Sequence, residues 1–82
     1  SNIRKIYYKN SYIKSLYEKG VKEIAKKVTE EAGETAISAV TKDGRLIEES
    51  ADLLFHLAVL LKNQGFSFED VLDELKSRNI NQ

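Results

Sequence analysis

Residues 26–36, with the sequence KKVTEEAGETA, combine three carboxylates with lysine and small apolar side chains. They lie within a longer segment in which apolar residues recur at intervals of three or four positions. This spacing is typical of an amphipathic α-helix, in which such residues share one face. The residues of that face are Val21, Ile24, Ala25, Val28, Ala32, Thr35, Ala36 and Ala39. The sequence therefore predicts a helix from about Val21 to Val40 that carries the acidic side chains.

The carboxylates of this helix point in two directions. At about 100° per residue, Glu31 and Glu34 fall on a narrow stripe at one border of the apolar face. Lys27 and Ser38 share this stripe. Glu30 lies further round the helix, toward solvent. We therefore expect Glu31 and Glu34 to border the element that packs against this helix.

A second acidic pair opens the next apolar segment. Glu49 and Asp52 precede the run LLFHLAVLL at residues 53–61, within a helix predicted from about Arg45 to Gln64. Apolar side chains cover about half of its circumference, which is wider than one core-facing stripe requires. A helix this apolar in so short a chain indicates that a second subunit covers part of it.

A short Asp-Gly turn at residues 43–44 makes the two helices antiparallel neighbours. Folding about this turn sets Glu34 level with Asp52 and Glu31 level with His56. Because an α-helix rises about 1.5 Å per residue, the two acidic pairs share a band on the order of 10 Å long. This length suits a triphosphate with one or two magnesium ions.

The composition limits the kinds of site and partner. Eighty-two residues make one small domain, too small to bury much of its surface alone. Thirteen basic and thirteen acidic residues cancel, so no overall field favours nucleic acid or a membrane. We expect a cytoplasmic protein, because we find no signal peptide, no membrane-spanning run and no cysteine. With one histidine, a metal site must use mainly oxygen ligands, which favours Mg²⁺ or Mn²⁺ over zinc.

The flanking segments complete an all-α prediction. Residues 1–10 form no predicted element and resemble a linker or a truncated N-terminal segment of the single domain. Ser11 is expected to cap a short helix that ends at Gly20. Ser67 and Asp70 have the spacing of a capping arrangement that starts a further amphipathic helix. We expect four to five helices, with a central antiparallel pair, dimerising into a larger helical bundle.

Clustered carboxylates bind polyphosphate only through a cation, because like charges repel. Magnesium held by carboxylates binds phosphate oxygens and acidifies a water molecule. With 32% charged residues, either acidic pair alone is more often a solvated surface. When two such pairs border one helix–helix seam, a functional site and a solvated surface become equally good interpretations.

Several stretches together resemble a known family. In chain order they are Ser11-Tyr12 with Leu16-Tyr17, Gly20, IAKKVTEE at residues 24–31, ETA at 34–36, ESADLLFHLAVLL at 49–61, and the segment from Gly65 to Arg78. The order resembles the phosphoribosyl-ATP pyrophosphohydrolases, which belong to the all-α nucleotide pyrophosphohydrolases of the MazG type. The signature of that group, Glu-x-x-Glu followed by Glu-x-x-Asp, matches residues 31–34 and 49–52.

The resemblance implies an enzyme that hydrolyses phosphoribosyl-ATP to phosphoribosyl-AMP and pyrophosphate, the second step of histidine biosynthesis. It also implies dependence on Mg²⁺, with Mn²⁺ as the alternative metal, and a homodimer of helical subunits. Fusion to, or association with, phosphoribosyl-AMP cyclohydrolase is a further expectation, because the segment before Ser11 is shorter than the leading helix of a stand-alone enzyme.

These expectations assign roles to individual side chains. The expected metal ligands are Glu31, Glu34, Glu49 and Asp52. The expected catalytic residues are Glu30, Glu31 and Glu34, with Glu30 as an extra ligand or a water-positioning base. The expected substrate contacts are Lys27, His56, Ser11, Tyr12 and Lys19.

Two other functions fit the same residues. A general MazG-like nucleoside triphosphate pyrophosphatase would use the same acids, although Ser11-Tyr12 and Lys26-Lys27 favour the histidine-pathway enzyme. A non-catalytic helical dimerisation module would leave the acids only solvated. Thr29 departs from the family pattern, which often has glycine there, but this change leaves the acids untouched.

Overall fold

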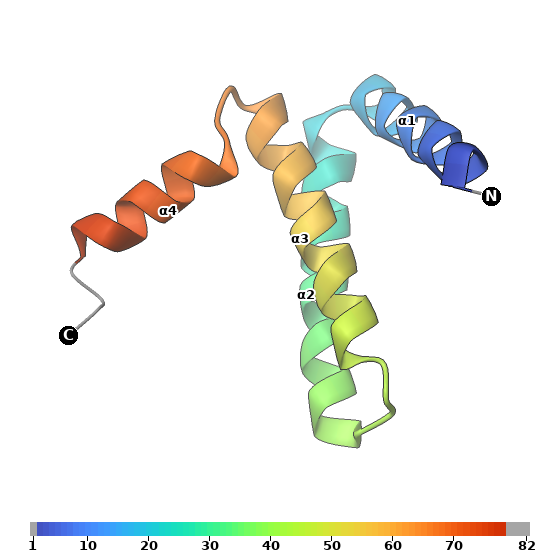
Figure 1. Ribbon diagram of the computed structural model, residues 1–82, viewed down its shortest axis with the longest axis vertical. Helices are drawn as coiled ribbons and strands as arrows, with labels where there is room; N and C mark the ends of the chain where they lie inside the picture. The colour runs from blue at the N-terminus through green and yellow to red at the C-terminus, as the bar shows by residue number, and fades with distance from the viewer. Residues whose placement is uncertain (1, 79–82) are drawn as a thin grey trace.

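The fold consists of helices joined by short turns. The computed structural model describes residues 2–78, with side chains from residue 10 onward, and this part of the chain contains four α-helices and no strand. The helices are α1 (Asn2–Lys19), α2 (Val21–Thr41), α3 (Leu46–Asn63) and α4 (Phe68–Ser77). Helices α2 and α3 run side by side, whereas α1 and α4 diverge from the end of this pair opposite its turn (Figure 1). The all-α prediction and the central antiparallel pair are confirmed.

Helix α1 is longer than the sequence pattern predicted. It begins at Asn2 rather than near Ser11, so Ser11 lies inside the helix and its predicted capping role is wrong. Neither glycine nor proline interrupts residues 2–19, and a serine inside a helix has only a small effect on stability. The capping preference of Ser11 is therefore outweighed by the gain from continuing the helix.

The turn between α2 and α3 is held by one aspartate. Lys42 adopts a left-handed conformation with φ 56°, and its N–H donates to the carbonyl oxygen of Ser38 at 2.9 Å. The Asp43 carboxylate accepts from the Ser38 hydroxyl and from the backbone N–H of Arg45. These two hydrogen bonds, that from Ser38 first, lower the pKa of Asp43 below its usual value of 3.8. The register of the two helices is thereby fixed at their connection.

The apolar core is small and lies where α1, α2 and α3 meet. Among residues 10–78, the buried apolar side chains are Leu16, Ile24 and Val59. Partly buried apolar residues pack around them, namely Tyr12, Ile13, Phe55 and Leu60. Each fully buried aliphatic side chain contributes about 1.5–3 kcal/mol. Because so few side chains are buried, the folded chain has little stability in reserve.

The apolar face predicted for α2 is only partly covered. Ala32, Ala36 and Ala39 are exposed, whereas Glu31 is half-buried and Ser38 is buried. Helix α3 thus packs against the polar border of α2 and leaves the face of small residues open. The sequence predicted the periodicity correctly, but the packing direction is shifted toward the acidic stripe.

None of the four helices is long and apolar enough to cross a membrane, within the part of the chain that the structure describes.

Candidate metal site

Three carboxylates converge at the seam between α2 and α3. Glu31 from α2 and Glu49 and Asp52 from α3 each offer an oxygen, and these three atoms lie within 4.8 Å of one another. The antiparallel register brings the acids together from positions about 20 residues apart in the sequence. Glu31 and Glu49 are half-buried and Asp52 is exposed, so the cluster opens toward solvent. The structure thus groups three of the four predicted metal ligands.

The fourth predicted ligand lies beside this group. Glu34 is exposed and does not contribute to the three-oxygen cluster among the described residues. It is nevertheless close enough for its charge to act on Glu31. The side chain of Glu34 therefore stands at the rim of the cluster, one helical turn beyond Glu31.

The electrostatics of the cluster reflect its uncompensated charge. The pKa of Glu31 is raised above its usual value of 4.5, mainly by partial burial and then by the negative charges of Glu34 and Asp52. Glu49 adds to this effect, whereas His56 opposes it. A divalent cation would relieve this repulsion. An all-carboxylate donor set matches hard cations such as Mg²⁺ and Mn²⁺, so the residues fit the expected metal.

Arg45 is a neighbour of the cluster that the sequence analysis did not single out. Its guanidinium lies 3.7 Å from a carboxylate oxygen of Glu49 and 3.1 Å from one of Glu48. The signal was present in the sequence as acidic residues three and four positions after an arginine on a helix. Arg45 therefore supplies positive charge at the edge of the acidic site nearest the turn.

His56 is buried and has partners at both ring nitrogens. Its Nδ1 lies 2.8 Å from the backbone oxygen of Asp52, and its Nε2 lies 2.7 Å from the hydroxyl of Tyr12. A carbonyl oxygen only accepts, so Nδ1 carries the proton, and in the neutral ring Nε2 accepts from Tyr12. The Tyr12 and Phe55 rings both pack against the imidazole, with centroids 5.6 and 5.2 Å away. His56 thus connects α1 to the turn of α3 that carries Asp52.

The remaining predicted site residues lie outside the cluster. Lys27 forms an ion pair with Glu30 at 3.8 Å, and both belong to α2. Ser11 and Lys19 are exposed on α1. Their expected contacts with substrate, and that of His56, stay predictions.

The sequence matches the family model described as phosphoribosyl-ATP pyrophosphohydrolase over residues 6–79. The chain belongs to this family. It is also 51% identical, over 76 residues, to a phosphoribosyl-ATP pyrophosphatase from Zymomonas mobilis, an alignment that covers 92% of this chain and 71% of that protein. The resemblance seen in the order of the sequence motifs is therefore confirmed.

Longer relatives are similar over most of this chain. The histidine biosynthesis bifunctional protein HisIE from Vibrio vulnificus is 49% identical over 71 residues, which cover 85% of this chain and 34% of that protein. HisIE from Buchnera aphidicola is 51% identical over 70 residues, which cover 84% of this chain and 33% of that protein. The chain thus spans about a third of these bifunctional relatives.

Proposed function

We propose that this phosphoribosyl-ATP pyrophosphohydrolase family member hydrolyses phosphoribosyl-ATP to phosphoribosyl-AMP and pyrophosphate, with Mg²⁺ as the metal. The observation that carries the proposal is the convergence of Glu31, Glu49 and Asp52 in a chain 51% identical to a phosphoribosyl-ATP pyrophosphatase. Three carboxylate oxygens within 4.8 Å suit a divalent cation, and such a cation is what an acidic surface needs in order to bind a polyphosphate.

In this proposal each side chain has a distinct task. Glu31, Glu49 and Asp52 hold Mg²⁺, which when bound polarises phosphate oxygens and lowers the pKa of water. Glu34, at the rim, completes the ligand set or accepts a proton from the attacking water. Glu30, which forms an ion pair with Lys27, is the alternative base.

Basic and hydrogen-bonding groups around the cluster would bind the substrate. Lys27 is placed on α2 one turn before Glu31 and would contact phosphate oxygens. His56 would do so through a protonated Nε2 with the Tyr12 hydroxyl displaced, because an unprotonated Nε2 is an acceptor like the phosphate oxygen. Ser11 and Lys19 would contribute from the exposed side of α1. Together with the cluster, these groups would bind the phosphates of the substrate.

We also propose a homodimer in the cytoplasm, associated with or fused to phosphoribosyl-AMP cyclohydrolase. The length and the bifunctional nature of the HisIE relatives support the fusion. Support for the dimer comes from the exposed apolar side chains of α2 and α3. Val40 is 82% exposed and Ile47 80%, and Ile37 and Leu54 are also more than half exposed. Apolar patches of this kind usually mark an interaction surface.

The test is pyrophosphate release from phosphoribosyl-ATP with Mg²⁺ and with a chelator. We expect turnover only with the metal, and an activity loss of at least a hundredfold in Asp52→Asn, with the helical circular dichroism unchanged. Asp73→Asn, the same chemical change on exposed α4, should keep wild-type activity. Equal or better turnover of deoxynucleoside triphosphates would favour the general pyrophosphatase instead. Absence of any pyrophosphate release by the full protein would favour the non-catalytic module.

A further inference from the structure

Arg45 is a cation held against the acidic cluster. One terminal nitrogen of its guanidinium lies 3.7 Å from a carboxylate oxygen of Glu49, and the other lies 3.1 Å from one of Glu48. Within residues 10–78, the pair of Arg45 and Glu49 is the one ion pair that includes a carboxylate of the cluster. The Glu49 side chain is only 14% exposed, whereas that of Arg45 is 52% exposed. Arg45 thus contacts the cluster from the solvent side, and much of its guanidinium is open to a ligand.

The turn between α2 and α3 fixes the backbone from which this side chain extends. The Arg45 N–H donates to the Asp43 carboxylate at 2.9 Å, and the Arg45 carbonyl oxygen accepts from the Glu49 N–H, also at 2.9 Å. Residues four positions apart on a helix are neighbours on its surface, so Arg45 and Glu49 stay close whatever their side chains bind. The guanidinium can therefore leave Glu49 by side-chain rotation alone, without a change in the fold.

The substrate proposed above brings further negative charge to a site that is already acidic. Glu31, Glu34, Glu49 and Asp52 together carry four formal negative charges, of which one divalent cation offsets two. A polyphosphate bound there gains from an additional cation beside the cluster. A guanidinium suits this role, because its planar fork of N–H groups binds two phosphate oxygens at once.

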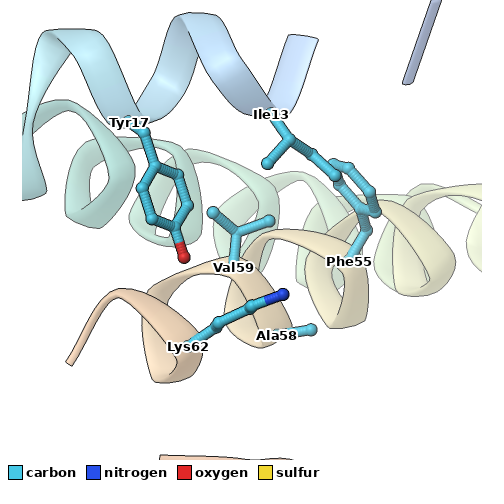
Figure 2. Close-up of a pocket in the computed structure, with 6 residues that line it drawn as sticks. All are labelled: Ile13, Tyr17, Phe55, Ala58, Val59 and Lys62. Carbon is cyan, nitrogen blue, oxygen red and sulfur yellow. The ribbon is translucent and has the colours of Figure 1, made fainter. Parts of the chain in front are cut away.

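The cation of the apolar groove between α1 and α3 is too distant for this role. The groove has a volume of about 370 Å³ and is lined by Ile13, Tyr17, Phe55, Ala58, Val59 and Lys62. Its walls are aromatic and aliphatic side chains, with the Lys62 side chain along one edge (Figure 2). Lys62 follows Asp52 by ten residues of α3, which is about 15 Å along the helix axis. The phosphates of a ligand at the cluster would therefore lie near Arg45 and not near Lys62.

We propose that Arg45 is a substrate-binding residue, which exchanges its contact with Glu49 for phosphate oxygens of the polyphosphate. This role rests on the metal-dependent reaction proposed above. In the metal-free protein the guanidinium offsets part of the charge of Glu49. A cation held by Glu49 makes that contact unfavourable, because both groups are positive, and the guanidinium then pairs with phosphate instead. Arg45 thus weakens the binding of metal alone and strengthens the binding of the polyphosphate.

Metal binding in the absence of substrate provides the first test. The probe is Mn²⁺, whose free ion is counted by paramagnetic resonance. Arg45→Gln should bind Mn²⁺ about threefold more tightly than the wild type at low ionic strength, and the difference should shrink as salt is added. Arg78→Gln makes the same chemical change in an ion pair with Glu74 and should keep the wild-type affinity. Equal or weaker Mn²⁺ binding by Arg45→Gln would overturn the exchange of partners.

Binding of inorganic pyrophosphate to the protein with saturating Mg²⁺, measured by calorimetry, provides the second test. Arg45→Gln should weaken this binding at least about tenfold, because a charge-assisted contact is lost, and should raise the KM for phosphoribosyl-ATP. Arg45→Lys keeps the charge but lacks the fork, so it should keep the wild-type Mn²⁺ affinity and recover only part of the pyrophosphate affinity. Circular dichroism of each variant should match that of the wild type.

The two measurements together separate substrate binding from a structural role. A disturbed fold would weaken the binding of both Mn²⁺ and pyrophosphate, whereas the proposed role changes the two affinities in opposite directions. Unchanged pyrophosphate binding in Arg45→Gln would overturn the role of Arg45 and leave the metal site and the reaction standing. A wild-type protein that binds no Mn²⁺ would overturn the metal site, and with it both the proposed function and the role of Arg45.

Discussion

Replacing Glu31 by glutamine should make the metal-free protein more stable while destroying its function. The carboxylate of Glu31 lies within 4.8 Å of those of Glu49 and Asp52, and all three carry like charge at neutral pH. Asp52 is exposed, so a water-like dielectric applies. Each pair then repels by about 1 kcal/mol at this distance. The two repulsions that Glu31→Gln removes therefore amount to about 2 kcal/mol at low ionic strength.

Salt reduces this gain, because the Debye length is about 10 Å at 0.1 M. We expect roughly 1 kcal/mol of added stability under those conditions. Glutamine has nearly the same helix propensity as glutamate, so the helix itself contributes no compensating loss. For a domain of this size, each kcal/mol raises the melting temperature by about 4–8 °C. The variant should therefore melt several degrees above the wild type in the absence of metal, and more so at low salt.

Thermal unfolding followed by circular dichroism, at one fixed protein concentration, measures the effect with chelator and with saturating Mg²⁺. Magnesium should raise the melting temperature of the wild type and have much less effect on Glu31→Gln, which should also lose pyrophosphate release. Glu48→Gln is the matched control, because it makes the same charge change on an exposed residue beside Glu49. Its stability should change by less than about 0.5 kcal/mol. A destabilised metal-free Glu31→Gln protein, or an equal magnesium response in wild type and variant, would refute the reasoning.

Four other perturbations have defined outcomes. The raised pKa of Glu31 favours its protonated form in the folded state. The free energy of unfolding of the metal-free protein, measured by denaturant titration, should therefore fall as the pH rises above 4.5, and Glu31→Gln should not show this trend. The lowered pKa of Asp43 acts in the opposite sense. The folding stability that this carboxylate contributes is present above pH 3.8 and is lost as the pH falls below that value, and Asp43→Asn should remove this loss. Tyr12→Phe leaves the buried Nε2 of His56 without its donor and should reduce the free energy of unfolding by about 1–3 kcal/mol, measured with urea; an unchanged midpoint would contradict the bond. Ser67→Ala removes a helix cap and should cost about 1 kcal/mol, seen as faster amide exchange in α4, whereas unchanged exchange there would show that the cap is dispensable.

The central hairpin could be predicted because its signals are local. The 3.6-residue periodicity of α2 and α3 and the Asp-Gly turn give the antiparallel pair, and the capping box at Ser67 gives the start of α4. These elements and the rise of a helix also place the two acidic pairs in one band, but they set Glu34 level with Asp52, whereas the structure brings Glu31 to Asp52. The start of α1 could not be read in the same way, because Ser11 suits a helix cap and a helix interior almost equally well.

Other features depend on side-chain packing between distant segments. The side of α2 that meets α3 differs from the predicted one by about one residue's rotation, and this rotation decides whether Glu31 or Ala32 is covered. The hydrogen bond from Tyr12 to His56 joins residues 44 positions apart. It requires side chains of α1 to pack against α3, which no short-range pattern encodes. The sequence therefore indicated which residue types make the site but not how His56 is held.

The aspartate in the turn between α2 and α3 has a consequence for the lengths this connection can tolerate. Surface turns usually accept added residues, because their ends are free to adjust. Here Asp43 binds Ser38 on one side and Arg45 on the other, so an inserted residue would separate its carboxylate from one of them. Helix α3 would then slide along α2, and Glu49 and Asp52 would move out of level with Glu31. The geometry of the acidic cluster therefore depends on the length of this turn as well as on the carboxylates themselves.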